Sequence, residues 1–225
     1  MTFRYALIFA AGRGERMRPL TDTTPKPLLE LGGKRLIEIH IEKLAAAGIE
    51  NIVINTSYHA EKFPLALGDG SRWGVSIHYS HEGARPLETG GGMLRALPLL
   101  GDAPFIAIAA DIVSDYDYAR LPDQPDGLAH LVMVPNPDFY PRGDFWLANG
   151  RLNESGNGER LTFSSIGVYR PQLVSGEADG CFKLLPMYQR AIHEGRLAGE
   201  RYDGLWHNIG TPAQLAELAS RTKPS

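Results

Sequence analysis

Short apolar segments alternate with segments of helical periodicity through the first half of this chain. The apolar segments are residues 6–9, 51–55, 75–79 and 105–110, and helical spacing of apolar residues spans 36–47 and, less regularly, 58–67. Strands and helices that alternate at such short intervals form a mostly parallel sheet with helices on both faces. The first half therefore predicts an α/β fold.

The second half has a different pattern. Residues 127–134 predict a further strand, and residues 145–147, 151–152 and 161–169 predict short strands between polar turns. A helix is expected at 182–196, a last strand at 202–209 and a final helix at 211–220, with Thr211 as its cap and Pro212 as its first residue. We expect one Rossmann-like α/β domain over residues 1–225, with a small antiparallel addition over the substrate site.

The first predicted strand runs directly into a loop of small, glycine and arginine residues. Gly12 and Gly14 allow a sharp turn and a close approach to a ligand. Successive backbone N–H groups in such a loop form a concave site for anions. Fixed positive charge comes from Arg13, Arg16, Arg18 and, between two prolines, Lys26. These residue types are those that hold a polyphosphate.

Two common phosphate-binding patterns do not fit this loop. In the dinucleotide pattern G-x-G-x-x-G, Met17 stands where the third glycine belongs. The P-loop pattern also fails, because no Gly-Lys-Ser/Thr follows. The loop must belong to another class of phosphate site.

A second glycine-rich segment is Leu87-Glu88-Thr89-Gly90-Gly91-Gly92, which leads into an expected helix at 93–100. Three glycines at a helix entrance predict exposed N–H groups that contact a base or a phosphate. A flexible helix start is the alternative.

The most apolar predicted strand, residues 105–110, ends on Asp111. Ligands of open α/β sheets bind at the carboxyl ends of strands, and hard divalent cations prefer oxygen ligands. Asp111 is therefore a candidate metal ligand, although it could instead cap the next element.

Composition excludes several classes of function. A net charge of −3 argues against a general nucleic-acid binder, and the single cysteine, Cys181, excludes an internal disulfide and a thiolate metal cluster. No secretory signal is evident, and no apolar run approaches the ~20 residues of a membrane span. We expect a cytoplasmic protein with no membrane or nucleic-acid partner, and the sequence implies no protein partner.

Six sequence elements together resemble the sugar-1-phosphate nucleotidyltransferase family. They are the string from Gly12 to Leu28 (G-x-G-x-R, P-L-T, then P-K-P-L), 87–92, the strand ending at Asp111, Arg142-Gly143-Asp144-Phe145, Phe182-Lys183-Leu184, and Trp206-His207-Asn208-Ile209-Gly210-Thr211. The resemblance covers nearly the whole chain. It implies that a sugar-1-phosphate attacks the α-phosphorus of a nucleoside triphosphate and expels pyrophosphate, with Mg²⁺ as cofactor and Mn²⁺ as the alternative. UTP and N-acetylmuramate-1-phosphate are the substrates it implies.

The resemblance also implies roles for individual residues. Arg16, Lys26 and Asp111 match catalytic positions, with Arg16 on the departing pyrophosphate and Lys26 on the α-phosphate. The nucleotide-binding positions are Ala11, Gly12, Gly14, Glu15, Arg16 and Lys26, together with Gly83, Thr89 and Gly90 around the uracil. Gly143 and Asp144 match sugar contacts, and Asp111 and Asn208 match the metal ligands.

Three positions depart from the family pattern. Ala109-Ala110-Asp111 replaces Asn-Gly-Asp, Asn208 stands where a second carboxylate is usual, and the phosphate-contacting lysine of larger relatives has no clear match, leaving Arg160 or Lys183 as substitutes. Two alternatives therefore stay open. One is a dTTP- or GTP-dependent enzyme for glucose- or mannose-1-phosphate, and the other is a catalytically weak sugar-nucleotide sensor.

Overall fold

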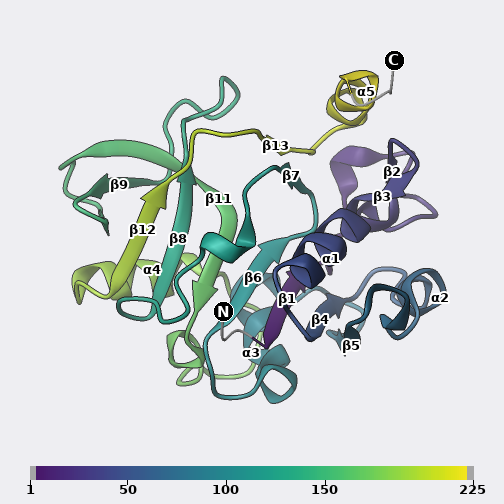
Figure 1. The fold of residues 1–225 in the computed structure, drawn as a ribbon, viewed down its shortest axis with the longest axis horizontal. Coiled ribbons are helices and arrows are strands. Elements are labelled where there is room, and N and C mark those ends of the chain that lie inside the picture. The colour runs from purple at the N-terminus through teal and green to yellow at the C-terminus, as the bar shows by residue number, and fades with distance from the viewer. Residues whose placement is uncertain (1–3, 222–225) are drawn as a thin grey trace.

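A computed structural model describes residues 4–221 of the chain (Figure 1). Its main feature is a nine-stranded sheet in the order β5-β4-β1-β6-β11-β8-β12-β10-β9. The predicted α/β class is confirmed, and the sheet is mixed: its first four strands are parallel, and antiparallel pairings begin at β11.

The parallel half contains β1 (Tyr5–Phe9), β4 (Asn51–Thr56), β5 (Ser76–His81) and β6 (Phe105–Ala109). Successive residues of β1 face opposite sides of the sheet. Ile8 packs with Ile37 of α1 (Leu36–Ala46) and Phe63 of α2 (Lys62–Leu67). Leu7 packs on the other side with Met93 of α3 (Glu88–Leu100). The helices therefore cover both faces, as the sequence predicts.

The antiparallel half extends the same sheet. Strand β11 (Glu159–Tyr169) runs against both β6 and β8 (Ala129–Val134), and its first residues continue to pair with β9 (Phe145–Ala148). The short strand β10 (Arg151–Asn153) lies between β9 and β12. The predicted antiparallel addition is present, and Figure 1 shows it on the opposite side of the molecule from α1 and α2.

The structure corrects the predicted order of elements near residue 200. The helix α4 (Leu185–His193) is shorter than predicted, and the chain turns at Gly195, whose φ is 66°. Residues Leu197–Arg201 then form β12, which runs parallel to β8 inside the main sheet. This strand was missed because Gly199, a weak strand former, interrupts its apolar pattern.

The predicted last strand is only β13 (Trp206–Asn208), which pairs with β7 (Ile112–Ser114) in a separate two-stranded sheet. The final helix α5 (Pro212–Arg221) begins as predicted, and Thr211 Oγ1 accepts the N–H of Gln214 at 3.3 Å.

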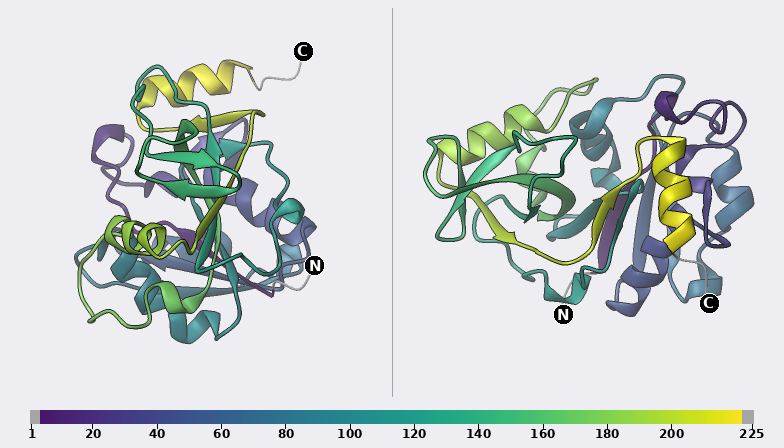
Figure 2. Two further views of the ribbon diagram at one scale, coloured as in Figure 1. Left: turned by 90° about the vertical axis from the view of Figure 1, so that its left-hand side faces the viewer. Right: turned by 90° about the horizontal axis from the view of Figure 1, so that it is seen from above.

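Helix α5, near the C-terminal end of the chain, packs against the loop after β1. Leu215 and Leu218 of α5 pack with Met17 of that loop and with Leu31 of β2 (Glu30–Leu31), which forms a hairpin with β3 (Lys34–Arg35). Figures 1 and 2 show α5 next to this hairpin. Among residues 4–221, no helix is both long and apolar enough to cross a membrane.

Candidate active site

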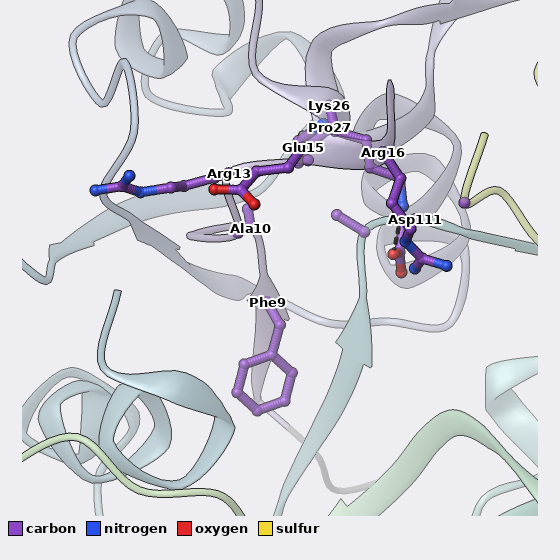
Figure 3. A pocket seen from close by; sticks show the side chains of 12 residues that line it. Phe9, Ala10, Arg13, Glu15, Arg16, Lys26, Pro27 and Asp111 are labelled. Carbon is purple, nitrogen blue, oxygen red and sulfur yellow. Dashed lines mark hydrogen bonds and ion pairs between the residues drawn. The ribbon is translucent and has the colours of Figure 1, made fainter. Parts of the chain in front are cut away.

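A cavity of about 400 Å³ lies at the carboxyl ends of β1 and β6 (Figure 3). Its lining contains most of the residues that the sequence predicts for phosphate binding, and the predicted metal ligand Asp111, together with their neighbours. They are Phe9, Ala10, Gly12, Arg13, Gly14, Glu15, Arg16, Lys26, Pro27, Ala110, Asp111 and Gly210. Ala11 is buried beside this lining and does not belong to it.

The loop after β1 is shaped by Gly14. Its φ is 63°, and its carbonyl accepts both the Thr21 hydroxyl at 2.9 Å and the N–H of Met17 at 2.8 Å. A Cβ at Gly14 would lie 3.1 Å from Lys26 Cβ, so the loop packs directly on the lysine stem. With Met17 buried beneath, Glu15 and Arg16 stay exposed at the cavity.

The three arginines of this loop point in different directions and have different neighbours. Arg16 extends toward the C-terminal segment, since a Cβ on Gly210 would lie 3.3 Å from Arg16 Nη1. Arg13 points away from Lys26 and Asp111 in Figure 3. Arg18 is outside the lining and pairs with Asp22 at 3.2 Å on the surface. Arg16 is thus the arginine nearest the C-terminal wall of the cavity.

Lys26 and Asp111 form an ion pair in the cavity. Lys26 Nζ donates to Asp111 Oδ2 at 2.6 Å, and the two side chains are 10% and 34% exposed. Buried Pro25 and Pro27 flank the lysine and fix its backbone, so that its stem is enclosed while its ammonium reaches the carboxylate. The structure therefore brings together a cation and an anion from segments 85 residues apart.

Asn208 lies on the strand that pairs with the segment following Asp111. In the pairing of β13 with β7, Asn208 is opposite Ile112, and the N–H of Ile209 donates to the carbonyl of Asp111 at 2.9 Å. The Asn208 Oδ1 is buried and has no hydrogen-bond partner within the described residues. Asn208 lines a neighbouring cavity of about 430 Å³, together with Trp206, Gln214 and others.

By type, these oxygen atoms are ligands that a hard divalent cation prefers. Asp111 presents a partly exposed carboxylate, and Asn208 presents an amide oxygen that lacks a donor, which is the ligand chemistry of Mg²⁺. Residues 4–221 contain no cluster of three or more His, Cys, Asp or Glu side chains that could hold a metal.

His40 of α1 holds the segment that follows Asp111. Its Nε2 lies 2.8 Å from the Ile112 carbonyl and its Nδ1 lies 2.8 Å from the Tyr118 hydroxyl. A carbonyl only accepts, so Nε2 carries the proton and Nδ1 accepts from Tyr118. Complete burial lowers the pKa of His40 to about 4 and keeps the ring neutral. Sequence reasoning missed this role, although His40 shares the helical spacing of the apolar core residues.

A second cavity, of about 300 Å³, adjoins the first at Phe9. Its lining is mainly apolar and aromatic: Phe9, Thr89, Ala109, Asp144, Phe145, Phe163, Ser165, Tyr169, Lys183, Leu184, Leu185 and Tyr188. Asp144 is positioned here by two donors. Its Oδ2 accepts the N–H of Phe163 at 2.7 Å and its Oδ1 accepts the Tyr140 hydroxyl at 3.0 Å.

Three residues predicted for ligand contact lie differently from the expectation. Gly143 is buried outside both linings, with φ 62°, and a Cβ there would lie 2.4 Å from Asn136 Oδ1, which explains the glycine by turn geometry. Gly83 also lines neither cavity, and its carbonyl accepts the Ser57 hydroxyl at 2.8 Å. Thr89 lines the second cavity rather than the first.

The prediction that Gly90, Gly91 and Gly92 offer exposed N–H groups is wrong. All three are buried within α3, and the N–H groups of Gly90 and Gly91 donate to the Phe182 carbonyl at 2.9 and 3.0 Å. A Cβ on Gly91 would lie 2.0 Å from the carbonyl oxygen of Gly180. The close approach that these glycines permit is therefore to another part of the same chain.

A buried polar chain behind the first cavity was missed entirely. Ala10 N–H donates to Asn55 Oδ1, Asn55 Nδ2 donates to Glu82 Oε1, and Leu87 N–H donates to Glu82 Oε2, each at 2.6 Å. Burial raises the pKa of Glu82, opposed by these hydrogen bonds. The chain links the ends of β1, β4 and β5 to the start of α3. The sequence carries no periodic signal for it, because each member simply ends an element.

Comparison with known proteins identifies the family. A family profile described as "Nucleotidyl transferase" matches residues 5–134, which is more than half of the chain. The chain belongs to the nucleotidyl transferase family. The predicted resemblance to sugar-1-phosphate nucleotidyltransferases is confirmed by curated relatives that match nearly the whole chain.

This nucleotidyl transferase resembles two curated proteins along almost its whole length. It is 46% identical over 220 residues to an N-acetylmuramate alpha-1-phosphate uridylyltransferase of Neisseria meningitidis, a match that covers 94% of this chain and 95% of the relative. It is 33% identical to a protein of the same name from Caulobacter vibrioides, and that match covers 96% of both chains. A mannose-1-phosphate guanylyltransferase of Mycobacterium tuberculosis is 36% identical over 59% of this chain and 38% of its own.

Solved structures confirm the fold. A putative glucose-1-phosphate thymidylyltransferase from Bacillus anthracis superposes with a TM-score of 0.85 at 20% identity, covering 98% of this chain and 96% of its own. An inositol-1-phosphate CTP transferase from T. maritima gives 0.80 at 18% identity, with coverage of 98% and 96%. The shared architecture includes both the parallel half and the antiparallel extension.

Proposed function

We propose that this nucleotidyl transferase joins UMP from UTP to N-acetylmuramate-1-phosphate and releases pyrophosphate. The observation that carries the proposal is the cavity in which Arg16, Lys26 and Asp111 meet behind the loop after β1. Such a site has cations for a triphosphate and a carboxylate for its metal. The choice of UTP and N-acetylmuramate is supported by the uridylyltransferases that match the chain over nearly its full length.

The reaction needs positioning and charge neutralisation rather than a covalent nucleophile. A phosphate oxygen of the sugar-1-phosphate forms a bond to the α-phosphorus of UTP. The bond from that phosphorus to the oxygen bridging to the β-phosphate breaks, and its electron pair leaves with pyrophosphate. Lys26 would stabilise the charge that develops on the α-phosphate, and Arg16 would hold the departing pyrophosphate.

Asp111, with Asn208 beside it, would hold Mg²⁺, for which Mn²⁺ is an alternative. When bound, the ion supplies neutralisation of the triphosphate oxygens. Ala11, Gly12, Gly14 and Glu15 would then form the wall around the phosphates. Of the residues predicted for the uracil, Gly83 and Gly90 line neither cavity and Thr89 lines the one proposed for the sugar. Asp144 would contact the sugar, and Gly143 would position Asp144.

We propose that residues 1–225 act as a single catalytic domain in the cytoplasm. A reducing compartment suits a chain with one cysteine, Cys181, which is exposed. Because muramate is a peptidoglycan sugar, the product would serve the recycling of cell-wall precursors.

The alternative enzyme function, with dTTP or GTP and glucose- or mannose-1-phosphate, is favoured by the partial match to mannose-1-phosphate guanylyltransferases. Release of pyrophosphate across a panel of nucleoside triphosphates and sugar-1-phosphates tests both functions with Mg²⁺ present. We expect the highest kcat/KM with UTP and N-acetylmuramate-1-phosphate. A higher value with GTP and mannose-1-phosphate would contradict the proposal, and binding without turnover on every pair would indicate a sensor.

A further inference from the structure

Within residues 4–221, Lys183 is a cation without a partner, in a cavity that is otherwise mostly apolar. It lines the second cavity, where Asp144 is the other charged residue of the lining, and its side chain is exposed. No hydrogen bond or ion pair within residues 4–221 involves its ammonium group. An unpaired cation at an apolar wall selects for an anionic group on the ligand.

The backbone around Lys183 is fixed on both sides. Phe182 N–H donates to the Leu87 carbonyl at 3.1 Å, and the Phe182 carbonyl accepts from Gly90 and Gly91. On the other side, Leu184 N–H donates to Thr89 Oγ1 at 3.0 Å. These bonds attach residues 182–184 to the first turn of α3. Gly90 and Gly91 permit this attachment, so they serve to place Lys183 at the cavity.

Asp144 does not neutralise Lys183. Both carboxylate oxygens of Asp144 already accept hydrogen bonds, from Tyr140 and from the backbone of Phe163, and no ion pair joins Asp144 to Lys183. Arg160, the other candidate substitute for the lysine of larger relatives, lies 5.6 Å from the Trp146 ring and is outside the lining. The cationic role in this cavity therefore belongs to Lys183.

The position of Lys183 also indicates which anion it contacts. The phosphate-binding cations Arg16 and Lys26 line the first cavity, and Lys183 does not. Because the two cavities meet at Phe9, an anomeric phosphate would lie near that boundary and the sugar ring would extend into the second cavity. Lys183 would then face a substituent of the ring.

We propose that Lys183 binds a carboxylate carried by the sugar, and so selects carboxylated sugar-1-phosphates over neutral ones. The proposal rests on the proposed function, in that it places the sugar in the second cavity. N-acetylmuramate carries a lactyl ether with a carboxylate, whereas N-acetylglucosamine has a hydroxyl at the same position. The two 1-phosphates are therefore a matched pair that differs in the group Lys183 contacts.

The test compares these two ligands in four proteins: wild type, Lys183→Met, Lys183→Arg and the control Lys34→Met. Lys34 is an exposed lysine of the β2–β3 hairpin that pairs with Glu42. Dissociation constants are measured by calorimetric titration in the presence of a non-hydrolysable UTP analogue and Mg²⁺. Steady-state KM and kcat with UTP follow for both sugars.

We expect wild type to bind the muramate ligand about tenfold more tightly than the glucosamine ligand, as for one hydrogen bond to a charged group. Lys183→Met should abolish this preference by weakening only muramate binding, with KM rising and kcat unchanged. Lys183→Arg should retain most of the preference, and Lys34→Met should behave as wild type.

Two outcomes would overturn the inference. Equal affinity of wild type for the two ligands would exclude a carboxylate contact, and equal weakening of both ligands in Lys183→Met would show that Lys183 contacts the anomeric phosphate. The proposed function is tested separately by wild-type turnover with UTP. Absence of turnover would refute that function, while the titrations would still report on Lys183.

Discussion

Lys26 Nζ lies 2.6 Å from Asp111 Oδ2, so the proposed α-phosphate contact and the proposed metal ligand neutralise each other in this structure. The pair joins the loop after β1 to the end of β6 across 85 residues of chain. A nucleotide with its metal would have to separate the pair, because both groups are needed by the incoming ligand. Lys26 thus holds the Asp111 carboxylate in place and competes with a cation for it.

This competition predicts two opposite effects of Lys26→Met. Turnover should fall by roughly 10²–10³-fold, the usual cost of losing one preorganised charge contact in the transition state. Affinity of the nucleotide-free protein for Mn²⁺ should rise, because Asp111 loses its competing cation. Steady-state kinetics and Mn²⁺ titration measure the two effects, with Lys34→Met as the exposed control. Near-normal turnover would remove Lys26 from the catalytic residues.

Asn208→Asp should tighten metal binding without changing which substrates are used. The buried Asn208 Oδ1 lacks a donor, and a carboxylate there would add a negative charge beside Asp111. We expect the gain to be larger in the empty protein than with nucleotide, because the triphosphate brings its own charge. Asp111→Asn should nearly abolish activity. If Asn208→Asp and wild type show the same metal dependence in both states, Asn208 only pins the turn before α5.

Asp144→Ala should weaken the sugar substrate and also lower stability. The family resemblance implies only a sugar contact for Asp144, but the structure shows that Asp144 also accepts the N–H of Phe163 and the Tyr140 hydroxyl. Leaving the part-buried N–H of Phe163 without an acceptor costs about 1–3 kcal/mol, whereas water can replace Asp144 at the exposed Tyr140 hydroxyl. Asp144→Asn keeps an acceptor oxygen and should separate the two effects, with smaller loss of unfolding free energy. Denaturant unfolding and sugar KM measure them. An unchanged KM in both variants would limit Asp144 to a structural role.

The buried His40 predicts that stability falls in mild acid. The pKa of His40 is lowered to about 4, whereas an unfolded histidine titrates near 6.5. Between these values the unfolded chain binds a proton that the folded chain excludes. Stability is therefore fully present above about pH 6.5 and declines as the pH falls toward 4, by about 3 kcal/mol in total.

Urea unfolding from pH 7.5 to 4 measures this effect in wild type, in His40→Gln and in the exposed control His78→Gln. The unfolding free energy of wild type and of His78→Gln should decline in the same way as the pH falls. The decline should be smaller in His40→Gln, by the amount that His40 contributes. An identical pH dependence in His40→Gln and wild type would show that His40 is not the titrating group.

Short stretches of sequence predicted those helices and strands whose signals lie within the same stretch. The apolar residues of β1 and β6 indicate buried strands, and Pro212 marks the start of α5. Strand β12 could not be predicted in this way, since its place between β8 and β10 depends on distant partners and Gly199 obscures its pattern.

The candidate site shows the same difference between residues with a local sequence signal and residues that meet only through the fold. Arg16, Lys26 and Asp111 were predicted because loop chemistry and strand ends are visible in sequence. The glycines of α3 were misinterpreted because a close approach to Gly180 and a close approach to a ligand require the same residue type. Asn55 and Glu82 were missed because their meeting depends on the sheet register that aligns β4 with β5.

The central claim is that UMP moves from UTP to the sugar phosphate in the cavity of Lys26 and Asp111. Its most direct test is to incubate the protein, Mg²⁺ and N-acetylmuramate-1-phosphate with UTP labelled at either the α- or the γ-phosphorus, and to identify the labelled products. We predict that the α-label appears in a UDP-sugar and the γ-label in pyrophosphate, and that both transfers are lost in Asp111→Asn. Recovery of the γ-label as inorganic phosphate, or an unlabelled sugar product from α-labelled UTP, would contradict the account.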